Sequence, residues 1–329
     1  MRNVLAPLVA LLGVLALCGC AAVNYPAGPA RATAHLEADH AVMADGAKLP
    51  LRHWGDETQP KAVLLALHGM NDYSNFFAEP GQYLATQGIL SFAYDQRGFG
   101  QAPHPGYWSS SQTMVEDARA MLDLMALRYR GVPLYLFGES MGGAVAILVA
   151  NQPPAGLDGV ILAAPAVWGR SAMPWWQRSV LWLAYHLAPG WMPSGRGLDI
   201  HPSDNIEMLR RLGADPLVIK ETRVDALKGV VDLMDDARAA PAEMKSPVLF
   251  LYGAHDEIIP PQPSWAAAAL MPRRRAAFYA HGWHMLVRDL EAKVVLDDMA
   301  AWMADVDAPL PSGADKAAPS LPEACSCTR

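Results

Sequence analysis

One serine lies in a setting that could make it a nucleophile. Residues 134–150 read as an apolar run, a glycine-rich turn with the sequence G-E-S-M-G at 138–142, and a second apolar run. In a sharp turn from a strand into a helix, glycines avoid clashes that side chains would cause, so Ser140 can be held exposed at the helix N-terminus. The alternative is that the glycines only punctuate a turn and Ser140 caps the helix. The remaining chemical groups must decide between the two.

A serine hydroxyl is a weak nucleophile at neutral pH, so it needs a histidine base and a carboxylate that orients the histidine. When the serine lies on such a turn, the acid and then the base follow it along the chain, each in the loop after a late strand. The apolar run 248–252 leads into G-A-H-D, and residues 276–279 lead into A-H-G-W-H. These positions predict Asp256 as the acid and His284 as the base.

Other residues compete for these roles. His281 is close to the predicted base, but it lies before the glycine, at the end of the predicted strand. Asp256 itself could serve only turn or capping chemistry, as aspartates in loops often do. Three further aspartates lie in a charged, helix-like stretch that is more typical of a solvated face: Asp232, Asp235 and Asp236.

Such a reaction also needs donors for a developing oxyanion. One donor is expected to be the backbone amide after the nucleophile, here Met141, and the other should come from the loop after an earlier strand. The apolar run 62–67 ends in H-G-M-N, which predicts the amide of Met70 as the second donor. We expect His68 to shape this loop through hydrogen bonds rather than to act as the base.

Five short motifs occur in the order found in monoacylglycerol lipases: L-H-G-M at 67–70, D-Q-R-G-F-G at 95–100, G-E-S-M-G-G at 138–143, G-A-H-D at 253–256 and G-W-H at 282–284. Over about residues 36–304, including G-A-D-P-L at 213–217, the chain resembles α/β-hydrolases of the monoacylglycerol lipase and lysophospholipase-like group, related to the serine aminopeptidases. The resemblance implies a triad of Ser140, Asp256 and His284, with Met70 and Met141 as oxyanion donors. A tryptophan-rich lid departs from the pattern and leaves substrate preference open.

The elements that must position these residues follow from apolar patterning. Runs without alternation indicate strands of a parallel sheet covered on both faces, at 62–67, 89–94, 134–137, 160–163 and 248–251. Between two of them, residues 115–129 repeat apolar side chains at helical spacing. Asp45-Gly46, flanked by 35–43 and 48–54, predicts a hairpin at an antiparallel edge. We therefore expect an α/β-hydrolase fold with a mostly parallel central sheet and helices on both faces.

The alternation of strands and helices is interrupted over residues 168–240. Prolines, bulky aromatic residues and then two helical patterns predict an inserted, largely helical cap between two parts of the core, at 34–167 and 241–304. Its apolar side chains could mostly pack the cap on the core, or form an acyl-chain entrance or a lid at a membrane boundary. The candidate substrate-binding residues are Trp175, Trp176, Trp182 and Leu183.

The N-terminal region predicts export. Arg2 precedes an apolar run over residues 4–17, shorter than the roughly 20 residues of a spanning helix, so residues 1–19 are expected to be a signal peptide. L-C-G-C-A at 17–21 resembles the lipobox of bacterial lipoproteins, which implies lipidation of Cys20 and a membrane anchor facing the periplasm or the cell surface, at the outer membrane if the host has one. An ordinary signal peptide cut nearby is the alternative. Residues 20–33 are expected to form a tether, and 305–329 a disordered tail.

Composition and motifs exclude several functions. The net charge of -7 gives no basis for nucleic-acid binding, and no P-loop or dinucleotide fingerprint occurs, so we expect no cofactor. Cys325 and Cys327 form a C-x-C that cannot supply a closed four-ligand zinc site, and no metal is expected. A serine rather than an aspartate at position 140 argues against dehalogenase or epoxide hydrolase chemistry.

These patterns lead to one main expectation, a membrane-tethered serine ester hydrolase that acts on monoacylglycerols, lysophospholipids or similar single-chain lipids through an acyl-enzyme on Ser140. Nearer alternatives are a short-chain carboxylesterase, an acyltransferase or an aminopeptidase. An alternative of another class is a non-catalytic envelope protein that uses the scaffold to bind apolar ligands.

Overall fold

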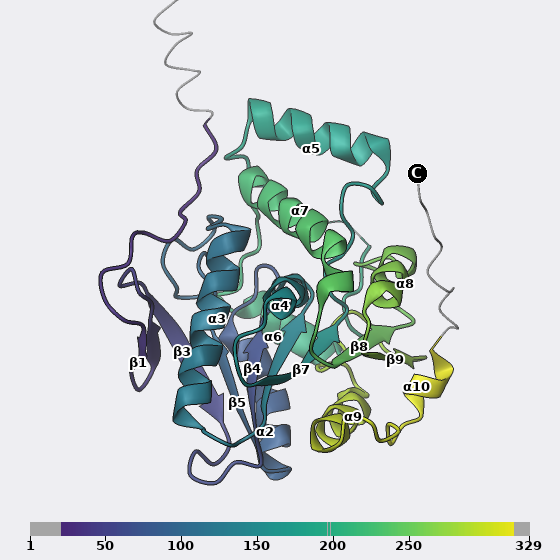
Figure 1. Ribbon diagram of the computed structural model, residues 1–329. Coiled ribbons are helices and arrows are strands. Elements are labelled where there is room, and N and C mark those ends of the chain that lie inside the picture. The colour runs from purple at the N-terminus through teal and green to yellow at the C-terminus, as the bar shows by residue number, and fades with distance from the viewer. Residues whose placement is uncertain (1–20, 196, 198, 319–329) are drawn as a thin grey trace, which may run out of the picture.

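The computed structural model describes residues 21–195, 197 and 199–318; the predicted signal peptide and Cys20 lie outside them. Within these residues one sheet has the order β1-β2-β3-β5-β4-β6-β7-β8-β9 (Figure 1). The strands are β1 (His35–Leu36), β2 (His40–Val42), β3 (Lys48–Trp54), β4 (Ala62–Leu67), β5 (Ile89–Tyr94), β6 (Leu134–Glu139), β7 (Leu157–Ala163), β8 (Val248–Gly253) and β9 (Arg274–Tyr279).

The sheet is parallel from β5 to β9 and antiparallel at the β1–β3 edge, where β3 also pairs antiparallel with β5. The predicted hairpin at Asp45-Gly46 joins β2 to β3, and Gly46 takes the positive φ of 88° that such a turn requires. The α/β-hydrolase architecture expected from the sequence, with its mostly parallel central sheet, is therefore confirmed.

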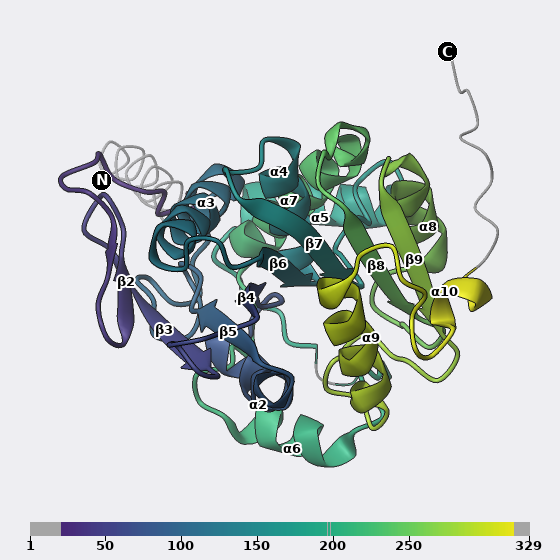
Figure 2. The ribbon, with the colours of Figure 1, turned by 60° about the horizontal axis from the view of Figure 1, so that its bottom comes forward.

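Helices cover both faces of the sheet, as Figure 2 shows, with α3, α4 and α8 on one face and α2 and α9 on the other. Their bounds, with one short 3-10 turn, are η1 (Ser74–Phe77), α2 (Ala78–Thr86), α3 (Ser111–Arg128), α4 (Met141–Asn151), α8 (Pro261–Leu270) and α9 (Ala292–Ala304). Ser110 caps α3 by accepting a hydrogen bond from the Thr113 amide at 3.0 Å.

The uninterrupted apolar strands have a direct explanation in this layering. In β4, Val63, Leu65 and Leu67 join a core cluster with α3 and α4, whereas the alternate residues Leu64 and Ala66 join a second cluster with α2 and α9. Each face is covered, so neither set of alternate positions is left for polar side chains.

The sheet is interrupted between β7 and β8 by the helices α5 (Trp175–Leu187), α6 (Ile206–Ala214) and α7 (Val224–Ala239), followed by the short turn η2 (Pro241–Glu243). Helix α7 packs on α4 of the core and carries buried residues, whereas α5 packs on α7 and has no buried residue. Figure 1 shows α5 on the outer side of α7. No helix of the described residues combines the length and the apolar character needed to cross a membrane.

The segment after residue 20 differs from the flexible tether that its composition predicted. Tyr25 stacks on His104 with ring centres 3.7 Å apart, and backbone amides of residues 23–28 donate hydrogen bonds to both the core and α7. An extended segment has no internal hydrogen bonds, so the amides of its non-proline residues remain free to donate to acceptors on a neighbouring surface. The hydrogen bonds are Val23 N to Asp225 Oδ2 (3.1 Å), Tyr25 N to Trp108 O (2.9 Å), Ala27 N to Thr113 Oγ1 (3.0 Å) and Gly28 N to Asp45 Oδ2 (3.0 Å).

The predicted disordered tail is wrong for residues 305–318, which pack on the domain. Leu310 is buried, and the short helix α10 (Ala314–Ala317) begins with a buried alanine. Asp315 accepts an ion-paired hydrogen bond from Arg275 of β9 at 3.0 Å. The composition of the tail suggested disorder, but its contacts include further hydrogen bonds, from Arg275 to Asp307 O and from Ser312 to Asp298 of α9. Cys325 and Cys327 lie outside the described residues.

Candidate active site

The predicted nucleophile lies at the turn between β6 and α4. Ser140 has φ 53° and ψ −115°, a conformation that L residues rarely adopt. The turn is held from both sides, because Ser140 N donates to Ala163 O at 3.0 Å and Ser140 O accepts from Ala166 N at 2.8 Å. These bonds to the end of β7 and the loop after it keep the strained residue in place.

The glycines of the turn avoid clashes that side chains would cause, as the sequence suggested. A Cβ at position 138 would lie 2.4 Å from Gly142 O, and one at position 142 would lie 2.2 Å from Leu67 O. Both distances are far below van der Waals contact with rigid backbone, so any larger residue would push β4 and the turn apart.

The predicted acid and base lie together. Asp256 follows β8 and His284 follows β9, and His284 Nδ1 lies 2.9 Å from Asp256 Oδ2. The other carboxylate oxygen accepts hydrogen bonds from the amides of Ile258 and Ile259 at 2.8 and 2.9 Å. Asp256 therefore both organises its turn and contacts the imidazole, as a residue that orients the base must.

The electrostatic surroundings make His284 a stronger base than an ordinary histidine. Its burial disfavours the charged ring, but the negative charge of Asp256, its hydrogen bond and the charge of Glu139 outweigh burial and raise the pKa of His284. The positive charge of Arg288 acts in the opposite direction.

The loop that carries Ser140 and the loop that carries His284 are joined by an ion pair. Arg288 Nη2 donates to Glu139 Oε1 at 2.6 Å, and Glu139 directly precedes the serine. Within the described residues, the Ser140 hydroxyl itself makes no hydrogen bond to the imidazole. Catalytic hydrogen bonds of this kind often form fully only with substrate present.

The loop after β4 passes beside the serine. A Cβ at Gly69 would lie 3.4 Å from Ser140 Cβ, which places the amide of the next residue, Met70, at the same turn. Met141 begins α4, where helix amides have no partner within the helix. In the described part of the chain, neither of these two amides donates a hydrogen bond to another protein group.

His68 shapes the same loop, as expected. Its Nδ1 donates to Gly69 O at 2.8 Å, and its Nε2 accepts from Gln96 N at 3.0 Å. Burial lowers the pKa of His68, and with both ring nitrogens engaged it is held neutral.

The rival residues lie elsewhere. His281 is exposed at the surface. Asp232 and Asp235 both form ion pairs with Arg170, and Asp232 also pairs with Lys228 on α7. Asp236 is exposed on the same helix. Neither the ion pairs nor the helix connect these aspartates to His284.

The four candidate substrate-binding residues lie exposed along α5. Trp175, Trp176, Trp182 and Leu183 have 72, 53, 62 and 51% of their surface accessible. The interpretation that such side chains mainly pack the cap on the core is therefore wrong for these four. The helix faces outward because α7, rather than α5, provides the buried contacts with the core.

The cap reaches the predicted oxyanion loop through residues that the sequence analysis did not select. Ile219 N donates to Asn71 O at 2.9 Å, Asn71 Nδ2 donates to Thr222 Oγ1 at 2.7 Å, and Tyr73 donates to Asp215. Asn71 and Asp215 fall within the H-G-M-N and G-A-D-P-L stretches, but nothing in the sequence indicated that these stretches join the cap to the core. In the described residues no group of three or more His, Cys, Asp or Glu is placed to hold a metal ion.

The parallel sheet, the strained serine turn after β6 and the Asp256–His284 pair after β8 and β9 together define an α/β-hydrolase. The family model described as serine aminopeptidase, S33, matches residues 58–291. The chain belongs to this family.

Two similar proteins carry lipase names. The monoglyceride lipase of Mus musculus is 30% identical over 277 residues, covering 80% of this chain and 89% of the relative. The monoacylglycerol lipase of Mycolicibacterium smegmatis is 25% identical over 269 residues, covering 78% and 93%. Together with the family match, these relatives support a carboxylic ester hydrolase.

Solved structures share the fold. A soluble variant of monoglyceride lipase from Saccharomyces cerevisiae, in complex with a substrate analog, has a TM-score of 0.69 at 20% identity and covers 85% of this chain and 98% of that one. The monoacylglycerol lipase of Paleococcus ferrophilus has a TM-score of 0.66 at 23% identity, covering 78% and 98%.

Proposed function

We propose that the protein is a serine hydrolase that cleaves carboxylic esters of single-chain lipids, such as monoacylglycerols or lysophospholipids. The observation that carries the proposal is the hydrogen bond of 2.9 Å between Asp256 and His284. The loop that carries His284 also contains Arg288, which forms an ion pair with Glu139, the residue before Ser140. The names of the relatives, monoglyceride and monoacylglycerol lipase, support the substrate class.

In the proposed reaction, Ser140 Oγ attacks the acyl carbonyl and His284 Nε2 accepts the serine proton. Asp256 accepts the hydrogen bond from Nδ1–H, which leaves Nε2 free as the base and stabilises the imidazolium. The amides of Met70 and Met141 receive the oxyanion. The imidazolium then protonates the alkoxide oxygen of the leaving group as the ester bond breaks. Water, deprotonated by the same histidine, attacks the acyl carbonyl of the acyl-enzyme, and the imidazolium returns a proton to Ser140 Oγ as the fatty acid leaves.

We also propose that the enzyme works at a membrane surface, as an exported lipoprotein anchored through Cys20. Two features support this. Helix α5 exposes three tryptophans and has no acidic residue, which suits insertion of its apolar side chains at a lipid–water boundary. The segment that follows Cys20 lies near this helix, because Asn24 and Tyr185 of α5 line the same surface pocket.

The test is hydrolysis of a substrate panel by the full chain and by Ser140→Ala. The panel contains monoacylglycerol, lysophospholipid, a short-chain p-nitrophenyl ester and an aminoacyl substrate. We expect turnover of the single-chain lipids, lost in Ser140→Ala, and covalent labelling of the wild type by a fluorophosphonate. Turnover of only the short ester or only the aminoacyl substrate would replace the lipase assignment with a carboxylesterase or an aminopeptidase. Acyl transfer to an added alcohol without net hydrolysis would indicate an acyltransferase, and the absence of labelling a non-catalytic binder.

A further inference from the structure

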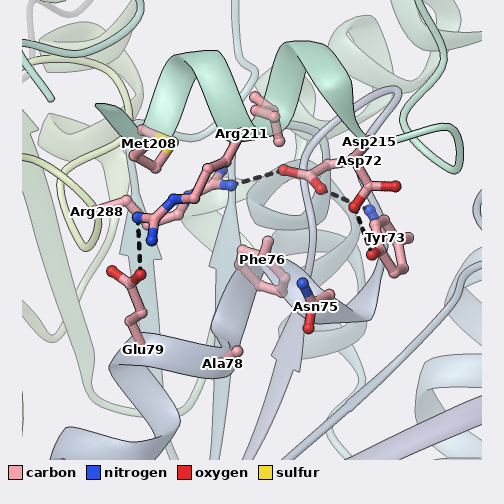
Figure 3. Close-up of a pocket in the computed structure, with 11 residues that line it drawn as sticks. Asp72, Tyr73, Asn75, Phe76, Ala78, Glu79, Met208, Arg211, Asp215 and Arg288 are labelled. Carbon is pink, nitrogen blue, oxygen red and sulfur yellow. Dashed lines mark hydrogen bonds and ion pairs between the residues drawn. The ribbon is translucent and has the colours of Figure 1, made fainter. Parts of the chain in front are cut away.

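A buried arginine joins the three loops of the candidate site. Arg288 Nη1 donates to Asp72 Oδ2 at 2.8 Å and Nη2 donates to Glu139 Oε1 at 2.6 Å. Figure 3 shows Arg288 reaching Asp72 beside Phe76, at the wall of a pocket of about 200 Å³ below α6. Only 6% of the residue is accessible, so water competes little for these contacts.

The partners of this arginine lie next to the reacting groups along the chain. Asp72 is two residues after Met70, and Glu139 is the residue before Ser140. Arg288 itself is four residues after His284. One guanidinium therefore connects the predicted oxyanion donor, the nucleophile turn and the base, whose relative positions must be held within a fraction of an ångström for the reaction.

The charges of Arg288 and Glu139 also affect the protonation of His284. Two carboxylates face one guanidinium, and the charge of Glu139 raises the pKa of His284 while that of Arg288 lowers it. Other charged or titratable groups near these residues include Asp256 on the imidazole, His68 in the oxyanion loop, and Asp289, which accepts from the Trp283 amide. From the cap and the segment after the oxyanion loop, the groups that line one pocket with Arg288 and Asp72 are Tyr73, Glu79, Arg211 and Asp215, and Lys220 lies close enough to interact with the charge of Asp72. Burial raises the pKa of Asp289 to about 6.

We propose that Arg288 is a positioning residue of the hydrolase reaction, which aligns the three loops and offsets the charge of Glu139 at the imidazole. This inference rests on the proposed function. Among the described residues Arg288 forms no hydrogen bond with Ser140 or His284, so it acts through its bonds to Asp72 and Glu139 and through its charge near His284.

A purely structural role is the competing explanation, and the chain provides a matched control for it. Arg97 is equally buried, with 6% of its surface accessible, and also bridges two carboxylates, Asp45 at 2.6 Å and Asp117 at 2.7 Å. Its partners lie in the β2–β3 hairpin and in α3, away from the three loops. Loss of this cluster should therefore cost stability without affecting the histidine.

The experiment compares Arg288→Met, Arg288→Lys, Glu139→Gln, Arg97→Met and the wild-type full chain. Measurements are kcat and KM for a soluble p-nitrophenyl ester, the acid limb of the pH profile, and melting temperature. We expect Arg288→Met to lower kcat about 100-fold with little change in KM. The kcat of Arg288→Lys should be about tenfold higher than that of Arg288→Met. Arg97→Met should lower the melting temperature but keep kcat and the acid limb.

The sign of the pH shift separates the proposal from general destabilisation. Removing the positive charge in Arg288→Met should raise the pKa of His284 and move the acid limb to higher pH by about half a unit or more. Removing the negative charge in Glu139→Gln should move it to lower pH. Shifts of the same sign in both variants, or equal effects in Arg97→Met, would overturn the proposal.

The same sign test is available without turnover. The pKa of His284 can be followed by NMR of its ring protons in the wild type, Arg288→Lys and Glu139→Gln, with His284→Gln used for assignment. Arg288→Lys keeps the charge, so it should leave this pKa near the wild-type value while Glu139→Gln lowers it. A protein that hydrolyses no ester of the panel disproves the proposed function, whereas an unmoved His284 pKa in Glu139→Gln disproves the charge balance.

Discussion

The imidazole of His284 and the carboxylate of Asp256 meet at 2.9 Å although 28 residues separate them in the chain. The sheet explains this contact. Strands β8 and β9 pair in parallel, so the loops that follow them leave from the same edge. The serine turn after β6 lies at that edge too, because β6, β7 and β8 are successive parallel neighbours. The order of the strands therefore assembles the candidate site.

Replacing the acid should inactivate the enzyme while leaving the fold intact. In Asp256→Asn the amide can still accept from Ile258 and Ile259, but it no longer fixes the imidazole tautomer or stabilises its charge. We expect kcat for ester hydrolysis to fall by about 10³-fold or more. Asp232→Asn is the control. Asp232 lies on α7 and forms ion pairs with Arg170 and Lys228, so this variant should keep wild-type kcat. Equal losses in the two variants would contradict the assignment of Asp256.

The activity should depend on pH with an acid limb above the ordinary histidine value. His284 must be neutral to accept the serine proton, and its pKa is raised from 6.5 by Asp256 and Glu139 against the effect of burial. Below this pKa the ring is protonated and cannot act as base. A profile of kcat/KM against pH should therefore reach half its plateau above pH 6.5. A midpoint at or below 6.5 would mean that another group limits the rate.

The amide of Met70 can be tested separately from its side chain. Met70→Ala keeps the backbone donor and should retain most activity, whereas Met70→Pro removes the N–H. We expect Met70→Pro to lower kcat by about 10² to 10³-fold, the usual effect of losing one oxyanion donor. Melting temperatures of both variants show whether the loop is still folded. Similar rates for the two variants would exclude this amide from the oxyanion site.

Local rules predicted the parts of the molecule that depend on neighbouring residues. The glycine turn around Ser140 and the apolar strands are encoded by residue type and spacing alone, and β4 and β5 begin and end at the predicted residues. His68 also acts in its loop as its position suggested. These features needed no knowledge of distant contacts.

The features that escaped prediction depend on partners far along the chain. Arg288 is one charged residue among many in the sequence, and only the fold brings it to Asp72, 216 residues away. The composition of the segment around Tyr25 is typical of a flexible tether. Its backbone amides nevertheless donate hydrogen bonds to Trp108 O and to the carboxylate of Asp225. Helix α5 is exposed because α7 packs on the core in its place. The apolar content of the two helices alone does not show which of them packs on the core.

The packing of the serine turn predicts a large difference between two glycine substitutions. Gly142→Ala places a Cβ 2.2 Å from Leu67 O, so β4 or the turn must move, and we expect a loss of about 3 kcal/mol in the free energy of unfolding and a loss of activity. Gly213→Ala lies in α6 with no atom within 4 Å of the new Cβ, and it should be neutral or stabilising by up to about 1 kcal/mol. Urea unfolding measures both. A Gly142→Ala protein as stable as Gly213→Ala would contradict the described turn.

The exposed face of α5 predicts a dependence of the rate on the lipid surface. Tryptophans at a bilayer boundary bury apolar rings while keeping their N–H groups wet, so Trp176→Ser combined with Trp182→Ser should weaken docking on vesicles. We expect the hydrolysis of monoacylglycerol in phosphatidylcholine vesicles, relative to hydrolysis of a soluble ester, to fall about tenfold. Leu127→Ser is the matched control, because Leu127 is as exposed as Trp182, at 62%, but lies on α3. If the control and the double variant change this ratio equally, α5 is not the surface that contacts lipid.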